Sequence, residues 1–178
     1  FPPDQVWTYT GGPHTGWGKG EPFSAVDFAP PAEHSGCVTV NTKNYAVAMA
    51  DGLVVRSNVD GLALDLDGDG DERTGWVLFY LHLASTTRAP AGKQLHAGDI
   101  IGYPSCEGGE VTGTHVHIAR KYNGEWILAD GPLALNLEGW VAHNGSQAYQ
   151  GTLTRGPAVI KACDCSDSPS SIKSDSRQ

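Results

Sequence analysis

Residues 75 to 84 (Gly-Trp-Val-Leu-Phe-Tyr-Leu-His-Leu-Ala) alternate between two faces with a period of two. The faces carry Val77, Phe79, Leu81 and Leu83 on one side and Leu78, Tyr80 and His82 on the other. Such a pattern is typical of a β-strand with both faces buried. We therefore predict a central strand here, in which His82 is a polar residue among apolar ones.

Further short strands are predicted along the chain, most of them separated by Gly-bearing turns such as Asp51-Gly52. They cover residues 37–40, 45–49, 53–58, 62–67, 99–103, 114–122 and 125–129. The 23 Gly and 11 Pro residues favour turns over long helices. We expect an all-β domain built as a barrel or sandwich.

Two segments fall outside this pattern. Residues 1–36 are rich in Gly, Pro and His and alternate little, which predicts a long ordered loop draped over the sheet. Residues 166–178 are polar and Ser-rich, which predicts a flexible tail or the start of a linker. The expected domain is therefore residues 1–165.

Composition and charge exclude several classes of function. A formal net charge of −8 argues against nucleic-acid binding, which needs clustered Lys and Arg. No apolar run of about 18 residues is present, so we expect no membrane insertion. We expect a monomer.

The start of the chain and its cysteines point to export. The sequence begins at Phe1 without an initiator Met or a targeting segment, which predicts a processed, secreted form. Cys37, Cys106, Cys163 and Cys165 fit one or two disulfides in an oxidising compartment. Four thiols allow three pairings, and the sequence does not choose among them.

One pair of histidines lies on a single predicted strand. His115 and His117 are two residues apart, so both imidazoles leave the same face of the strand. Taken alone, the pair is explained equally well by surface histidines with ordinary partners. His82, flanked by Leu81 and Leu83 on the predicted central strand, favours a functional cluster because buried polar groups without partners are costly.

The N-terminal segment supplies further metal-binding side chains, His14 and Asp27. The glycines of this segment are expected to give the backbone the freedom to turn both side chains inward; they are Gly11, Gly12, Gly16, Gly18 and Gly20. Together with His117, these two residues form a candidate His₂Asp zinc site. Three protein ligands and one open position are the pattern of a catalytic zinc.

These residues carry a family resemblance. The motifs are His14 in a Gly-rich segment, Ser24-Ala-Val-Asp-Phe28, Tyr80-Leu-His-Leu-Ala84, Thr114-His-Val-His-Ile118, and the passage Ala91-Gly-Lys-Gln-Leu-His-Ala-Gly-Asp-Ile-Ile-Gly102. In this order they resemble the lysostaphin-type (LytM-like) metallopeptidases. The long spacing between His14 and Asp27 is most similar to the β-lytic and staphylolysin branch.

The resemblance implies an antiparallel β-sheet crossed by a substrate groove. It also implies a zinc metalloendopeptidase that hydrolyses peptide bonds in the cross-bridge or stem of peptidoglycan. Carried over by position, His14, Asp27 and His117 are the zinc ligands. His82 and His115 flank the zinc-activated water without binding the metal.

Tyr149 is a further candidate catalytic residue, chosen for its phenol. A phenol is a common additional donor to an oxyanion, and Tyr149 lies in a turn-rich segment beyond the strands. The alternative is an ordinary half-buried surface tyrosine.

The acidic run Asp65-Leu-Asp-Gly-Asp-Gly-Asp71 matches the first half of a calcium loop. Its carboxylates are those of Asp65, Asp67, Asp69 and Asp71, but Trp76 stands where such a loop needs its bidentate Glu. The run is therefore either a solvated hairpin tip or a Ca²⁺ site that is not an EF-hand.

Two other functions compete with the peptidase. A catalytically inactive module of the same fold would bind cell wall or activate an amidase, but such a protein usually loses a ligand. A lipoyl or biotinyl carrier domain is suggested by the Gly98-Asp-Ile-Ile-Gly102 turn and strand. It lacks a Lys at an exposed hairpin tip in a matching motif.

Overall fold

The chain folds almost entirely into β-strands joined by turns. A computed structural model describes residues 1–31, 36–163 and 168–174. The strands are β1 (Val6–Thr15), β2 (Phe23–Ala29), β3 (Ala46–Val47), β4 (Gly52–Asn58), β5 (Gly61–Asp65), β6 (Trp76–Leu81), β7 (Gln94–Leu95), β8 (Ile100–Gly102), β9 (Val116–Tyr122), β10 (Glu125–Trp126), β11 (Asn136–Leu137), β12 (Trp140–Asn144), β13 (Gly151–Arg155), β14 (Ala158–Lys161) and β15 (Ser171–Lys173). One turn of 3₁₀-helix, η1 (Ser168–Ser170), precedes β15. The expected all-β class is confirmed.

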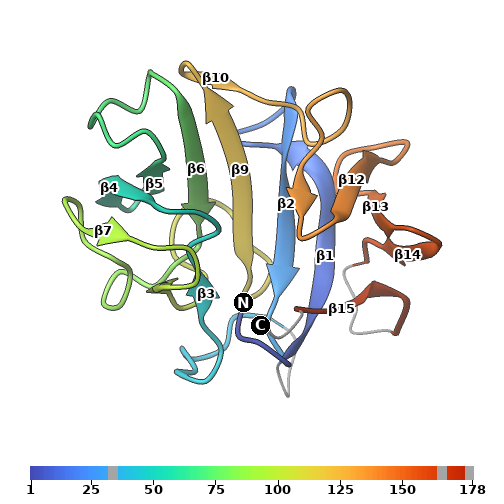
Figure 1. The fold of residues 1–178 in the computed structure, drawn as a ribbon. Coiled ribbons are helices and arrows are strands. Elements are labelled where there is room, and N and C mark those ends of the chain that lie inside the picture. The colour runs from blue at the N-terminus through green and yellow to red at the C-terminus, as the bar shows by residue number, and fades with distance from the viewer. Residues whose placement is uncertain (32–35, 164–167, 175–178) are drawn as a thin grey trace.

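An antiparallel sheet forms the centre of the molecule (Figure 1). Its strand order is β15-β1-β2-β9-β6-β5-β4-β7, and β10 pairs with β9. The strands β11 to β14 form a second sheet beside β1, and β3 pairs with β8. The residues of the candidate site described below come from β1, β2 and β9, from positions next to the ends of β6 and β9, and from the segment before β13.

Both faces of the central strands are buried. Tyr80 of β6 and Val26 of β2 belong to the main core, whereas Phe79 of β6 packs in a smaller cluster on the opposite face, with Ala25 and Ala119. The predicted central strand is thus confirmed, with β9 and β5 as its neighbours.

The expectation of a loop over residues 1–36 is wrong. β1 and β2 lie inside the central sheet, between β15 and β9. In β1 the alternation is confined to residues 6–11 and is followed by a fully buried Gly-Pro-His stretch, and in β2 the side chains are buried on both faces, so neither strand carries a long alternation of polar and apolar residues. The predicted strand at residues 37–40 does not form.

The C-terminal segment is only partly described. Cys165 and residues 164–167 and 175–178 lie outside the described residues. Ser171–Lys173 was expected in a flexible tail, yet it forms β15 against β1, with Ile172 buried opposite Trp7. One apolar side chain in a polar segment is enough to hold this short strand, and it is a weak signal in the sequence.

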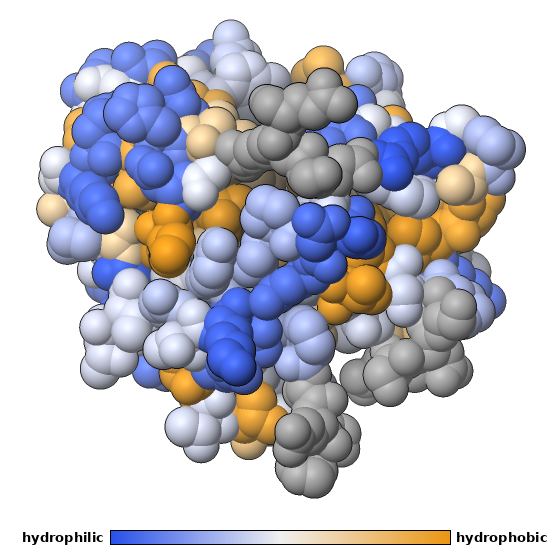
Figure 2. Space-filling view, turned by 60° about the horizontal axis from the view of Figure 1, so that its bottom comes forward, coloured by the Kyte–Doolittle hydropathy of each residue, from blue (hydrophilic) through white to orange (hydrophobic). Residues whose placement is uncertain are grey.

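None of the described residues forms a helix long and apolar enough to cross a membrane. On the face seen in Figure 2, apolar residues form separate patches between hydrophilic ones.

Candidate metal centre

Three neighbouring strands bring together His14 of β1, Asp27 of β2 and His117 of β9. Asp27 pairs directly with His117 across the sheet. The pairing of β1 with β2 is irregular between Gly11 and His14. Such bulges re-aim side chains and tolerate proline, which stands here as Pro13. The irregularity therefore accounts for the inward turn of His14.

The three side chains meet through one atom each. His14 Nε2 lies 3.1 Å from His117 Nδ1 and 3.3 Å from Asp27 Oδ1, and His117 Nδ1 lies 3.2 Å from Asp27 Oδ1. Ligand atoms that share one tetrahedral zinc at about 2.0–2.1 Å lie about 3.3–3.4 Å apart. The observed triangle therefore has the size of one face of a zinc tetrahedron.

In His14 and His117, the ring nitrogen that points away from the cluster fixes the tautomer of the imidazole. His14 Nδ1 lies 2.8 Å from the Gly12 carbonyl oxygen, and His117 Nε2 lies 3.0 Å from that of Gly16. A carbonyl only accepts, so these nitrogens carry the protons and the inner nitrogens present lone pairs. Asp27 Oδ1 is buried without a hydrogen-bond partner. Three acceptors thus converge in a buried site, and this arrangement fits a cation.

The carboxylate of Asp27 is held in its charged form. Burial opposes ionisation, but the interactions with His117 and His14 outweigh it and lower the pKa of Asp27 on balance. An ionised Asp27 is the form that binds a metal.

His115 and His82 lie beside this cluster. His115 Nε2 is 3.8 Å from Asp27 Oδ1, and its ring centroid is 4.4 Å from that of His82. Each Nδ1 faces a carbonyl oxygen, that of Gly113 at 2.8 Å for His115 and that of Glu107 at 3.0 Å for His82. Burial, and then the charge of His115, lower the pKa of His82 to about 4. His82 is therefore neutral at neutral pH.

His82 is not on the strand where the sequence placed it. β6 ends at Leu81, and His82 has a φ of 62°, in the left-handed region. This sparsely populated conformation costs energy for a residue other than glycine. It ends β6 three residues before the predicted end at Ala84 and brings the ring beside His115.

Tyr149 reaches the site from the segment before β13. Its ring stacks on His14, with centroids 4.1 Å apart, and the Gly12 amide donates to its carbonyl oxygen at 2.8 Å. Burial, and then the charge of Asp27, raise the pKa of the phenol. The structure thus brings all six candidate residues together.

The glycines near the site serve close packing rather than unusual backbone angles. A Cβ on Gly11 would lie 2.5 Å from Asp27 Oδ2, and one on Gly16 would lie 2.5 Å from Ser24 Oγ. The left-handed conformation occurs at Gly18 and Gly20, farther along the chain. Sequence reasoning missed this role, and it missed the backbone carbonyls that orient the four histidines. Backbone acceptors leave no signal in residue type.

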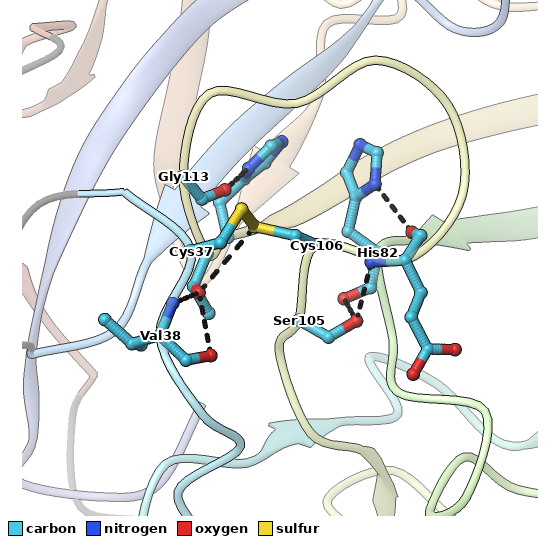
Figure 3. The surroundings of a disulfide bond; sticks show 9 residues. Cys37, Val38, His82, Ser105, Cys106 and Gly113 are labelled. Atoms are coloured by element: carbon cyan, nitrogen blue, oxygen red, sulfur yellow. Dashed lines mark hydrogen bonds between the residues drawn. A yellow bond between two sulfur atoms is a disulfide. The ribbon is translucent and has the colours of Figure 1, made fainter.

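A disulfide joins Cys37 to Cys106 beside the two nonligand histidines (Figure 3). Cys106 lies between Ser105, whose hydroxyl donates to the His82 carbonyl, and Glu107, whose carbonyl faces the His82 ring. This pairing is one of the three that the sequence left open.

The acidic run lies at the tip of the β5–β6 hairpin, away from the histidines. Oxygens of Asp65, Asp67 and Asp69 lie within 4.8 Å of one another. Asp71 does not join them and pairs instead with Arg73, from which its two oxygens accept hydrogen bonds at 2.8 and 2.7 Å. The expected group of four carboxylates is therefore a group of three.

Comparison with known proteins identifies the fold. No protein-family model matches the chain, and no curated protein matches its sequence. Pseudoalterin, a novel M23 metalloprotease from the deep sea, superposes with a TM-score of 0.71 at 20% identity over 91% of this chain and 92% of that one.

Two other M23-related structures are more distant. The catalytic domain of the prophage-encoded M23 protein EnpA from Enterococcus faecalis has a TM-score of 0.49 at 24% identity, over 75% of this chain and 95% of that one. The catalytic domain of the antimicrobial peptidase lysostaphin from Staphylococcus simulans has a TM-score of 0.46 at 21% identity, over 69% and 87% of the two chains. The assignment therefore rests on pseudoalterin: this chain has the fold of an M23 metalloprotease.

Proposed function

We propose that the chain is a zinc metalloendopeptidase that hydrolyses peptide bonds of bacterial peptidoglycan. The convergence of His14 Nε2, His117 Nδ1 and the unpartnered Asp27 Oδ1 in one buried triangle carries the proposal. The fold shared with an M23 metalloprotease supports the reaction class. The sequence motifs support the substrate class, and the spacing of His14 and Asp27 supports the β-lytic branch.

Zinc held by two imidazoles and one carboxylate, with one open position, lowers the pKa of water toward about 7 and polarises a carbonyl. His115 and His82 then move protons beside this position. Because each donates its Nδ1 proton to a backbone carbonyl, each keeps Nε2 as a proton acceptor. We assign to this pair the transfer of a proton from water to the leaving amine.

Tyr149 completes the proposed catalytic set. Its ring is stacked on the ligand His14, so the phenol belongs to the same site, although the residue is 55% exposed. We assign it the role of a hydrogen-bond donor to the oxyanion that forms during amide hydrolysis.

We also propose that the protein acts outside the cell as a monomer. The Cys37–Cys106 disulfide supports an oxidising compartment. On the face that Figure 2 shows, the apolar patches are separate, which supports a face that no second subunit covers.

Digestion of purified cell walls tests the function. We expect the zinc-loaded chain to release new amino termini, a chelator to abolish the release, and one equivalent of zinc to restore it. Mass analysis of the fragments from walls with different cross-bridges identifies the bond. Zinc binding without cleavage of any wall would instead support the inactive binding module.

Substitution of Gly11 by Ala tests the packing behind the ligand. The new Cβ would lie 2.5 Å from Asp27 Oδ2 and displace the carboxylate. Displaced supporting contacts typically weaken metal binding by about 10–100-fold, and we expect a loss of this size in a competitive zinc titration. Thr8→Ala, in the same strand but opposite Ala29, is the control. Equal zinc affinities of the Gly11→Ala and Thr8→Ala variants would show that close packing at Gly11 does not position Asp27.

A further inference from the structure

Asp65 is a buried carboxylate with one oxygen that has no partner. It ends β5, its relative exposure is 0%, and its Oδ2 accepts a hydrogen bond from the Gly70 amide at 2.9 Å. Its Oδ1 is buried and unsatisfied. Burial of an unpartnered carboxylate oxygen is costly, so the group needs a cation or a proton that the neighbouring side chains do not supply.

The unpartnered oxygen belongs to a carboxylate that faces two others. Asp65, Asp67 and Asp69 offer oxygens within 4.8 Å of one another. Asp67 also lies so close to Gly75 that a Cβ there would be 2.0 Å from Asp67 Oδ2. The loop thus holds its carboxylates together, although like charges favour their separation.

The donor set selects the type of cation. All three groups are carboxylates, which suit the hard cations Ca²⁺ and Mg²⁺, whereas zinc favours nitrogen and sulfur. Their order, with Gly70 after Asp69, follows the first half of a calcium loop. Mg²⁺ demands near-ideal octahedral geometry, whereas Ca²⁺ accepts irregular oxygen shells completed by water.

From these observations we infer that Asp65, Asp67 and Asp69 bind one Ca²⁺ at the tip of the β5–β6 hairpin. The ion balances the charge of the buried Asp65 carboxylate and stabilises the loop that joins β5 to β6. β6 runs from this loop to Leu81, so the site strengthens the strand that leads directly to His82 beside the metal centre. This inference does not depend on the proposed peptidase activity.

Calorimetric titration of the full chain with CaCl₂ tests the site. With few protein ligands, we expect one ion per chain at the weak end of the protein range, with a Kd of about 10⁻⁴–10⁻³ M. At a Kd of about 1 mM, 10 mM CaCl₂ raises the melting temperature by about 3–6 °C. Asp67→Asn and Asp69→Asn, both at exposed positions, are expected to weaken binding at least tenfold and to lose the rise.

Asp60→Asn is the matched control, because Asp60 is an exposed aspartate in the neighbouring β4–β5 turn. We expect it to bind calcium like the unmodified chain. No binding up to 10 mM CaCl₂ would overturn the inference and leave a proton shared between Asp65 and Asp67. Unchanged binding by the Asp67 and Asp69 variants would overturn it as well, and an equal rise with MgCl₂ would overturn the choice of calcium.

Discussion

His117→Ala is expected to abolish both zinc binding and peptidase activity, whereas His115→Ala keeps one zinc per chain and loses most turnover. His117 Nδ1 lies 3.1 Å from His14 Nε2 and 3.2 Å from Asp27 Oδ1, so its removal leaves two ligands. His115 Nε2 lies 3.8 Å from Asp27 Oδ1 and is outside the triangle. Loss of a residue that transfers protons typically costs about 10²–10⁴-fold in rate.

Metal analysis of the purified variants, together with wall-digestion rates, checks this division of roles. His96→Ala, at an exposed position, serves as the control and should keep both zinc and activity. Because metal binding contributes to folding stability, His117→Ala should also melt at a lower temperature than His115→Ala in the presence of zinc. Equal loss of zinc from both variants would contradict the assignment of ligand and proton carrier.

The second large effect is expected from removal of the disulfide by the double substitution Cys37→Ser and Cys106→Ser. The bond closes a loop with a sequence separation of 69 residues. Chain entropy predicts a loss of about 4 kcal/mol in the free energy of unfolding for a loop of this length. For a domain of this size, the melting temperature should fall by roughly 8–16 °C.

Turnover should fall as well, because the disulfide supports the loop that orients both nonligand histidines (Figure 3). Beside it, the Val38 amide donates to Thr114 Oγ1 and the Thr114 amide donates to the Gly36 carbonyl. Gly113, next to Thr114, accepts from His115. We therefore expect the double variant to keep its zinc at low temperature but to cleave more slowly.

Calorimetric melting, metal analysis and digestion rates measure the three effects separately. The unmodified chain without a reductant is the control, because a reductant would also open the disulfide of Cys163. Unchanged melting temperature and turnover would show that hydrogen bonds alone hold this loop.

The sequence singled out the residues that meet in the cluster more clearly than the strands that carry them. His14, Asp27 and His117 belong to residue types with few other uses at buried positions, so their motifs stand out. β6 was equally clear, because its alternating side chains run without interruption. β1 escaped prediction because buried Gly, Pro and His residues interrupt its alternation, and β2 because it is buried on both faces.

The remaining features depend on contacts between distant segments. The carbonyl of Gly16 orients His117, yet the two residues are 101 positions apart. The positive φ of His82 likewise follows from the surrounding loop, because histidine itself does not favour it. The pairing of Cys37 with Cys106 depends on how the sheet brings their loops together.

The pairing of Asp27 with His117 across β2 and β9 has a consequence for how the sheet assembles. If β2 slipped by one residue, Asp27 would turn to the opposite face and would enter the apolar core around Val26 and Phe28. A misaligned sheet would therefore bury a carboxylate among aromatic rings and would lose the triangle of acceptors. Only the correct register of β2 against β9 brings the three acceptors together, so only the correctly paired sheet can bind the metal.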